Sequence, residues 1–141
     1  DRVSKIYILQ FASNNLDTNI YINQFLSLNL VWNKGVAFGL LSFEKSLIYN
    51  LITTLILIIN LIILYVVFIY KDVRAYFFLM ILGGSLGNLF DRLYYRSVPD
   101  FIDISFQEYH WFIFNVSDIF ITLGVICLIV AEILMNKKTY V

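Results

Sequence analysis

Two aspartates in the C-terminal half, Asp100 and Asp118, have the clearest chemical potential in this chain. Asp100 lies in the apolar segment 98–102, where an unpaired carboxylate would be costly to bury. If folding brings the two carboxylates together, they cannot both ionise and must share one proton. Such a pair can deprotonate a water molecule and polarise a peptide carbonyl, which is the chemistry of an aspartic protease.

A plain helix start also explains part of this pattern. Asn115 precedes Asp118 by three residues, so Asn115 can serve as the N-cap of a helix and Asp118 as the residue that completes a capping box. The helix dipole also favours a carboxylate at that position. The spacing alone therefore leaves both interpretations of Asp118 open.

A second polar cluster ends a glycine-rich apolar stretch, 83–92, and contains Asn88, Asp91 and Arg92. Residues three and four apart lie on one flank of a helix. The spacing of Gly83 and Gly87 is typical of close helix packing. Packing does not require the polar groups, and such groups at membrane depth usually mark functional sites.

Other catalytic schemes lack the residues they need. His110, the only histidine, lies among aromatic residues typical of a membrane interface, and Cys127 lies within an apolar run. The sequence shows neither the partners of a nucleophilic triad nor the ligand spacing of a metal site around these two residues. We therefore expect no metal, no cofactor and a packing role for Cys127.

The elements that carry these residues are those of a membrane protein, since 60% of the 141 residues are hydrophobic and the mean hydropathy is +0.80. Uncharged runs at 46–70, 75–90 and 119–131 predict three full spans once polar ends are placed at the interface. Residues 6–12 resemble the last turns of a further span that has been cut. One domain, 1–141, is expected.

Two segments between the spans have extramembrane character. Apolar and polar residues alternate within 19–32, which predicts a strand with Leu26, Leu28, Leu30 and Trp32 on one face, followed by a turn at 33–35. Interfacial aromatic residues occur within 94–114. The basic link 71–74 and the tail at Lys137 suit the cytoplasmic side. Ten basic and ten acidic residues argue against a nucleic-acid partner.

Five sequence blocks, taken together, resemble bacterial lipoprotein signal peptidase, the signal peptidase II family. In order, these blocks are Asp1 with Lys5, then 33–38 (NKGVAF), 83–92 (GGSLGNLFDR), 98–102 (VPDFI) and 114–118 (FNVSD). The third block is highly specific. Pro99 replaces a residue that is usually small and aliphatic, and Ser117 replaces one that is usually alanine.

The resemblance implies an all-α bundle of four membrane helices, the first truncated here, with a small extramembrane β-sheet cradle. It implies a multi-pass enzyme of the bacterial cytoplasmic (inner) membrane that cleaves prolipoproteins before the diacylglyceryl-modified cysteine, on the outer side. The resemblance also assigns Asp100 and Asp118 as the catalytic pair. The remaining matches divide into candidate support or substrate residues, Asn33, Gly35, Asn88, Asp91, Arg92 and Asn115, and candidate structural residues, Asp1 and Lys5.

Two alternatives are weaker. In a small transport subunit, Asp91, Asp100 and Asp118 would relay protons or bind a cation, but a relay favours carboxylates spread through the membrane depth. A different intramembrane aspartic protease would, by resemblance to those families, carry a Gly-x-Gly-Asp motif, which is absent. Membrane lipid is an expected contact, and nothing in the chain demands more than a monomer.

Overall fold

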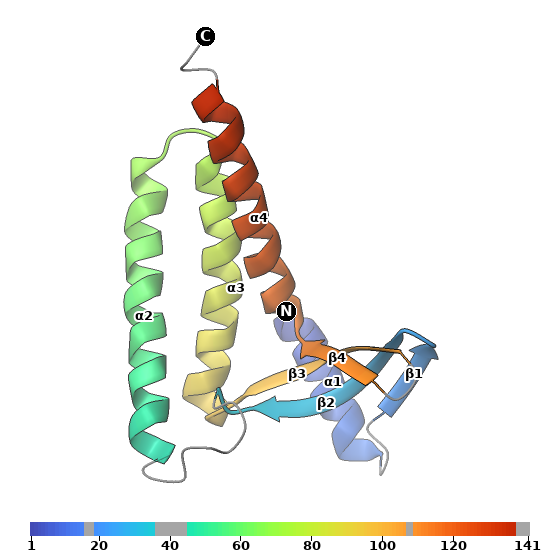
Figure 1. The fold of residues 1–141 in the computed structure, drawn as a ribbon. Coiled ribbons are helices and arrows are strands. Elements are labelled where there is room, and N and C mark those ends of the chain that lie inside the picture. The colour runs from blue at the N-terminus through green and yellow to red at the C-terminus, as the bar shows by residue number, and fades with distance from the viewer. Residues whose placement is uncertain (16–18, 36–44, 107–108, 138–141) are drawn as a thin grey trace.

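The computed structural model describes residues 1–15, 19–35, 45–106 and 109–137 (Figure 1). Within these residues, long helices stand at one side of a small antiparallel sheet. In chain order the elements are α1 (Arg2–Asn14), β1 (Asn19–Asn23), β2 (Leu26–Asn33), α2 (Lys45–Ile69), α3 (Arg74–Tyr95), β3 (Val98–Phe106), β4 (Tyr109–Phe114) and α4 (Val116–Lys137). The predicted runs at 75–90 and 119–131 fall within α3 and α4, and the run at 46–70 matches α2 except for Tyr70, which lies just after the helix.

Two of the described helices are long and apolar enough to cross a membrane. They are Leu47–Ile69, with a mean hydropathy of 2.9, and Val116–Met135, with 2.4. Helix α3 has 22 residues but ends in a polar segment that contains Asp91 and Arg92. Of the three predicted spans, the length and hydropathy of the described helices support those in α2 and α4. Figure 1 shows α3 between α2 and α4, and it contacts both helices.

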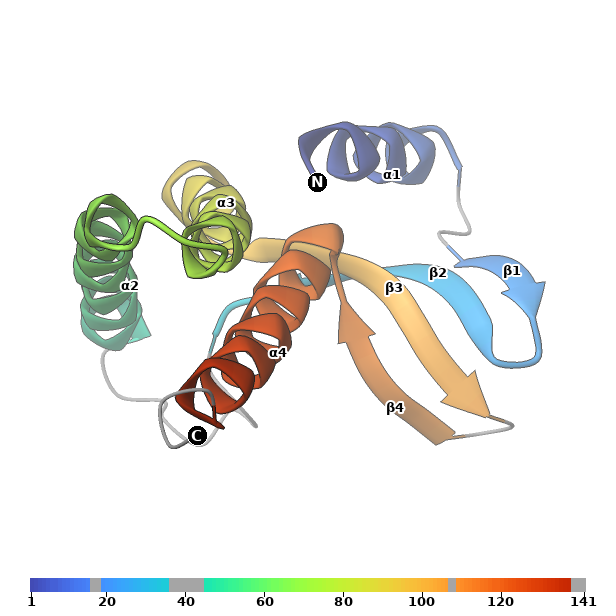
Figure 2. The ribbon, with the colours of Figure 1, turned by 90° about the horizontal axis from the view of Figure 1, so that it is seen from above.

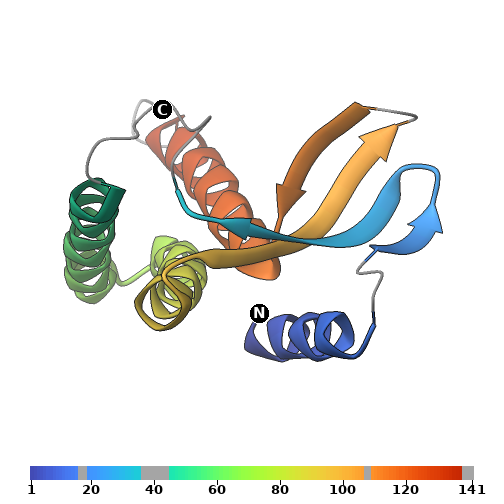
Figure 3. The same cartoon turned by 90° about the horizontal axis from the view of Figure 1, so that it is seen from below.

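Helix α1 runs across the other helices. Figures 2 and 3 show it from the side in views where α2 and α3 are seen nearly end-on. Its buried residues are Lys5 and Ile8, so a charged side chain occupies part of the face that it turns toward the protein. The polar contacts of that side chain are described below with the site.

The four strands form one antiparallel sheet in the order β1-β2-β3-β4. The sequence predicted strand structure in 19–32, and the structure divides it into two strands joined by a turn at Gln24 and Phe25. The predicted apolar face is wrong, because Ser27 is the buried residue of β2 while Trp32 is 40% exposed. A bulge between Leu28 and Val31 breaks the two-residue period on which that prediction depended.

Helices α3 and α4 approach each other closely where glycine faces the partner helix. A Cβ atom at Gly84 would lie 2.5 Å from the backbone oxygen of Ser117, and one at Gly124 would lie 2.9 Å from that of Phe77. Gly83 has no such neighbour within 4 Å. The predicted contact through Gly83 and Gly87 is thus half right, because Gly87 contacts α4 but Gly84, not Gly83, provides the second close approach.

Candidate active site

The predicted site residues converge where the sheet meets the helices. Asp100 lies on β3, Asp118 lies in the first turn of α4, and Asn33 ends β2 beside β3. Asn88, Asp91 and Arg92 come from the polar end of α3, and Asp1 and Lys5 from the start of α1. Residues 36–38 of the second sequence block lie outside the described residues.

Asn115 links the two aspartates directly. Its Oδ1 accepts a hydrogen bond from the backbone N–H of Asp118 at 3.2 Å, and its own backbone N–H donates to Asp118 Oδ2 at 3.1 Å. This reciprocal pair is the predicted capping box. The Nδ2 group of the same side chain donates to Asp100 Oδ1 at 2.6 Å. A helix cap therefore also ties Asp118 to Asp100, so the two interpretations of the motif are compatible.

Asp100 is the more enclosed carboxylate, with 4% of its surface exposed. Its Oδ2 accepts a hydrogen bond from Asn33 Nδ2 at 3.0 Å, and Asn33 Oδ1 accepts one from the backbone N–H of Gly35 at 2.8 Å. Burial raises the pKa of the Asp100 carboxyl, the hydrogen bonds from Asn115 and Asn33 lower it, and the Asp118 carboxylate raises it. The net direction is upward, which favours a protonated Asp100.

Asp118 is connected to α1 through α3. Asn88 Nδ2 donates to Asp118 Oδ1 at 2.8 Å, and Asn88 Oδ1 accepts from Lys5 Nζ at 3.0 Å. The Lys5 ammonium also lies 2.6 Å from Asp91 Oδ2 and 2.8 Å from Asp1 Oδ2. These contacts join three elements that are far apart in the sequence.

Asp91 is buried and paired with two cations, Lys5 and Arg2. The Arg2 guanidinium also lies 4.7 Å from the centre of the Phe90 ring. This environment favours a structural role for Asp91, which fastens α1 to α3. Arg2 was not among the predicted site residues. Its position three residues before Lys5 was the available signal, because that spacing places both cations on one flank of a helix.

Arg92 faces a different part of the site. Its Nε and Nη1 atoms are buried and have no hydrogen-bond partner among the described residues. A Cβ atom at Gly35 would lie 2.7 Å from Arg92 Nη1 and would displace the guanidinium, and the φ of +72° at Gly35 is a left-handed conformation that favours glycine. Tyr49 of α2 donates to the Arg92 backbone oxygen at 2.7 Å.

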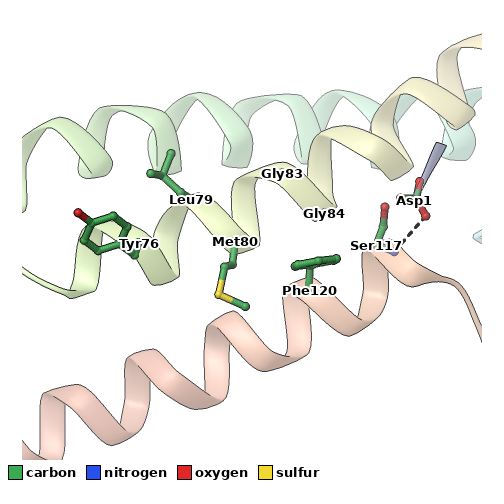
Figure 4. Close-up of a pocket in the computed structure, with 8 residues that line it drawn as sticks. All are labelled: Asp1, Tyr76, Leu79, Met80, Gly83, Gly84, Ser117 and Phe120. Atoms are coloured by element: carbon green, nitrogen blue, oxygen red, sulfur yellow. Dashed lines mark hydrogen bonds between the residues drawn. The ribbon is translucent and has the colours of Figure 1, made fainter. Parts of the chain in front are cut away.

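Two further polar contacts were not predicted. The backbone N–H of Ser117 donates to Asp1 Oδ1 at 3.0 Å, and both residues line a pocket between α3 and α4 together with Met80 and Phe120 (Figure 4). His110 Nδ1 lies 2.7 Å from Oδ2 of the buried Asp103, on the neighbouring strand. The sequence predicted that His110 lies at a membrane interface, and the His110 side chain is 56% exposed. The sequence did not indicate that Asp103 is the partner of His110.

An apolar groove of about 510 Å³ lies along β4 and the first turns of α4. Asp118 forms part of its wall, and its other lining residues are Phe112, Ile113, Phe114, Ile119, Thr122 and Leu123. An apolar ligand in this groove would lie next to a carboxylate of the site. This is the composition expected where a few polar groups orient a largely apolar ligand.

Solved structures described as a bacterial membrane enzyme share this arrangement of helices and sheet. Two solved structures described in those words match this chain, one with a TM-score of 0.68 and 31% identity over 99% of this chain and 83% of that chain. The other has a TM-score of 0.67 and 29% identity, over 91% and 83% respectively.

The sequence model of Signal peptidase (SPase) II matches residues 1–134. A lipoprotein signal peptidase of Pelagibacter ubique is 51% identical over 98% of this chain and 83% of its own length. One of Anaplasma marginale is 37% identical over 100% of this chain and 82% of its own length. The chain belongs to the signal peptidase II family, which is a family of proteases, as the sequence blocks predicted.

Proposed function

We propose that this chain removes the signal peptide from prolipoproteins, with Asp100 and Asp118 as its catalytic pair. The observation that carries the proposal is the Asn115 side chain, which binds the Asp100 carboxylate and the backbone of Asp118 at once. The relatives named lipoprotein signal peptidase supply the reaction. The cut is made before a cysteine that carries a diacylglyceryl group.

The chemistry needs one ionised and one protonated aspartate. The ionised carboxylate takes a proton from water as the water oxygen attacks the scissile carbonyl carbon, and the protonated carboxyl gives its proton to the carbonyl oxygen. The tetrahedral intermediate then collapses: the C–N bond breaks, the first aspartate passes its proton to the leaving amine, and the second recovers its proton from the hydroxyl. The pair ends in its starting state.

The surroundings of the pair suit an apolar, membrane-borne substrate. The groove beside Asp118 is almost entirely apolar, and Arg92 offers guanidinium N–H groups that lack partners among the described residues. A guanidinium in this position is suited to hold a peptide carbonyl of the substrate. Membrane lipid surrounds the helices in this account.

We further propose a single-domain, monomeric, multi-pass protein of the inner membrane, with four helices in the bundle. The sheet and the aspartates would lie at the outer face. The support is the separation seen in Figure 1, where the sheet lies at one end of the helices and the α2–α3 link at the other. Family membership gives no support to the transport-subunit alternative.

A direct assay tests the proposed reaction. Purified protein in detergent is incubated with a prolipoprotein that carries the diacylglyceryl group, and loss of the signal peptide is followed as a gel shift. The matched control is the same prolipoprotein without the lipid. We expect cleavage of the lipidated form only, and an intact lipidated substrate would contradict the proposal.

A further inference from the structure

Lys5 makes one contact that the joining of α1 to α3 does not require. Its ammonium group is fully buried and pairs with Asp91, which joins α1 to α3, and with Asp1, one turn earlier in the chain. The third contact, at 3.0 Å, goes to Oδ1 of Asn88. That amide in turn contacts a carboxylate of the candidate catalytic pair.

The Lys5 contact determines which way the Asn88 amide faces. An ammonium group can only donate hydrogen bonds, and a carboxylate can only accept them. Asn88 must therefore present its oxygen to Lys5 and its NH₂ group to Asp118 Oδ1, which it reaches at 2.8 Å. A flipped amide would lose both hydrogen bonds. A positive charge on the oxygen side also polarises the amide and strengthens donation on the other side.

Asp118 is the better placed of the two aspartates to hold a negative charge. Besides the Asn88 amide, it accepts the backbone N–H of Asn115 and lies in the first turn of α4, where the helix dipole favours an anion. Asp100 also accepts two amide hydrogen bonds, but it is buried on β3 and its amide donors have no cation behind them among the described contacts.

The charged groups that face Lys5 come from several elements. Asp1 and Arg2 lie at the start of α1, Asp91 lies on α3, Asp118 on α4 and Asp100 on β3. The four paired groups Asp1, Arg2, Lys5 and Asp91 carry two positive and two negative charges. Loss of the Lys5 charge would leave this group with a net negative charge beside the pair.

We propose that Lys5 is a positioning residue that, through Asn88, makes Asp118 the carboxylate that carries the negative charge, with the shared proton on Asp100. This proposal rests on the proposed function. Asp118 then takes the proton from the attacking water, and Asp100 gives its proton to the carbonyl oxygen of the substrate.

The pH profile of kcat separates this role from simple support of the fold. Loss of a nearby cation disfavours the ionised carboxylate, so Lys5→Met should move both limbs of the profile to higher pH by about one unit. Lys5→Arg keeps the charge and should keep the limbs in place even if the rate falls. In an Asn88→Ala background, Lys5→Met should cause a smaller shift, because the connecting amide is absent.

Asp91→Asn removes a negative charge where Lys5→Met removes a positive one. It therefore tests the same proposal if the Lys5→Met protein does not fold. It leaves Lys5 with less negative charge nearby, so the limbs should move to lower pH. A folded Lys5→Met or Asp91→Asn protein with an unshifted profile overturns the proposal, as does an equal shift with and without Asn88. Failure of the unsubstituted protein to cleave would instead contradict the proposed function.

Discussion

At the residue scale, the site is governed by amides that bind carboxylates. Asn33 and Asn115 donate to Asp100, and Asn88 donates to Asp118. An amide hydrogen bond stabilises the ionised form of a carboxyl without adding charge. Burial acts on Asp100 in the opposite direction and raises its pKa. The balance between these effects sets the pH range in which one aspartate is protonated and the other ionised.

Removal of the Asn33 amide should move this balance. Its hydrogen bond lowers the pKa of Asp100, so Asn33→Ala should raise that pKa further, and activity should persist to higher pH before the protonated carboxyl is lost. A hydrogen bond of about 1 kcal/mol corresponds to somewhat less than one pH unit. The pH dependence of kcat is the measurement, and Gln24→Ala in the exposed β1–β2 turn is the control. A shift to lower pH would contradict this account.

Arg92 should affect substrate binding more than proton transfer. Arg92→Ala removes a guanidinium with buried N–H groups that have no partner among the described residues, and loss of such a group costs about 2 to 3 kcal/mol when it binds a substrate carbonyl. We expect KM to rise while the pH profile stays in place. Steady-state kinetics with a lipidated substrate measure both quantities, and unchanged KM would show that Arg92 has no substrate contact.

At the element scale, the start of α4 combines a structural and a chemical task. The capping box of Asn115 and Asp118 satisfies backbone groups of the first turn, and the same two side chains reach Asp100 and Asn88. The site therefore depends on how closely α4 approaches α3. That approach depends on glycine, because Gly84 lies against the backbone of Ser117.

Replacing Gly83 and Gly84 separately with alanine should distinguish the effect of the α3–α4 contact from the effect of the higher helix propensity of alanine. A Cβ atom at Gly84 would lie 2.5 Å from a backbone oxygen, so Gly84→Ala should push α4 away, destabilise the protein by about 1 to 3 kcal/mol and reduce activity. Gly83→Ala meets nothing within 4 Å and should be neutral or slightly stabilising. Thermal unfolding in detergent compares the two, and equal effects would argue against a specific contact at Gly84.

The sequence indicated the helices well because their apolar runs are long and uncharged. It did not predict β3 and β4, whose aromatic residues in 98–114 are typical of both strands and membrane interfaces. The aspartates, Asn88 and Asn115 were singled out from residue type and spacing, and Asn33 from the family resemblance. Their partners were not, because Arg2 and Lys5 meet Asp91 across 89 and 86 residues, and such contacts depend on the fold.

At the scale of the whole molecule, the helices are covered with exposed apolar side chains. Only 11% of the apolar window in each of α2 and α4 is buried within the protein, and Phe68 of α2 is 73% exposed. Surfaces of this kind are typical of helices that cross a membrane. At the end far from the sheet, Arg74 pairs with Asp72 at 2.7 Å and with Glu132 at 3.0 Å, which ties the α2–α3 link to α4.

The two ends of the helices should face opposite sides of the membrane. In a Cys127→Ala background, a cysteine at Lys71 should be protected from an impermeant thiol reagent in intact cells, because basic links favour the cytoplasmic side. A cysteine at Tyr109, which is 73% exposed at the tip of the sheet, should be labelled. Equal labelling of both positions would contradict the proposed orientation.

The central claim is that Asp100 and Asp118 act as one unit. Each Asp→Asn change is nearly isosteric but removes the carboxyl that must hold or release a proton, so Asp100→Asn and Asp118→Asn should each abolish turnover of a lipidated prolipoprotein while the fold is kept. Loss in either single variant should approach loss in the double variant. A folded single variant that still cleaves at an appreciable rate would contradict the assignment of the catalytic pair.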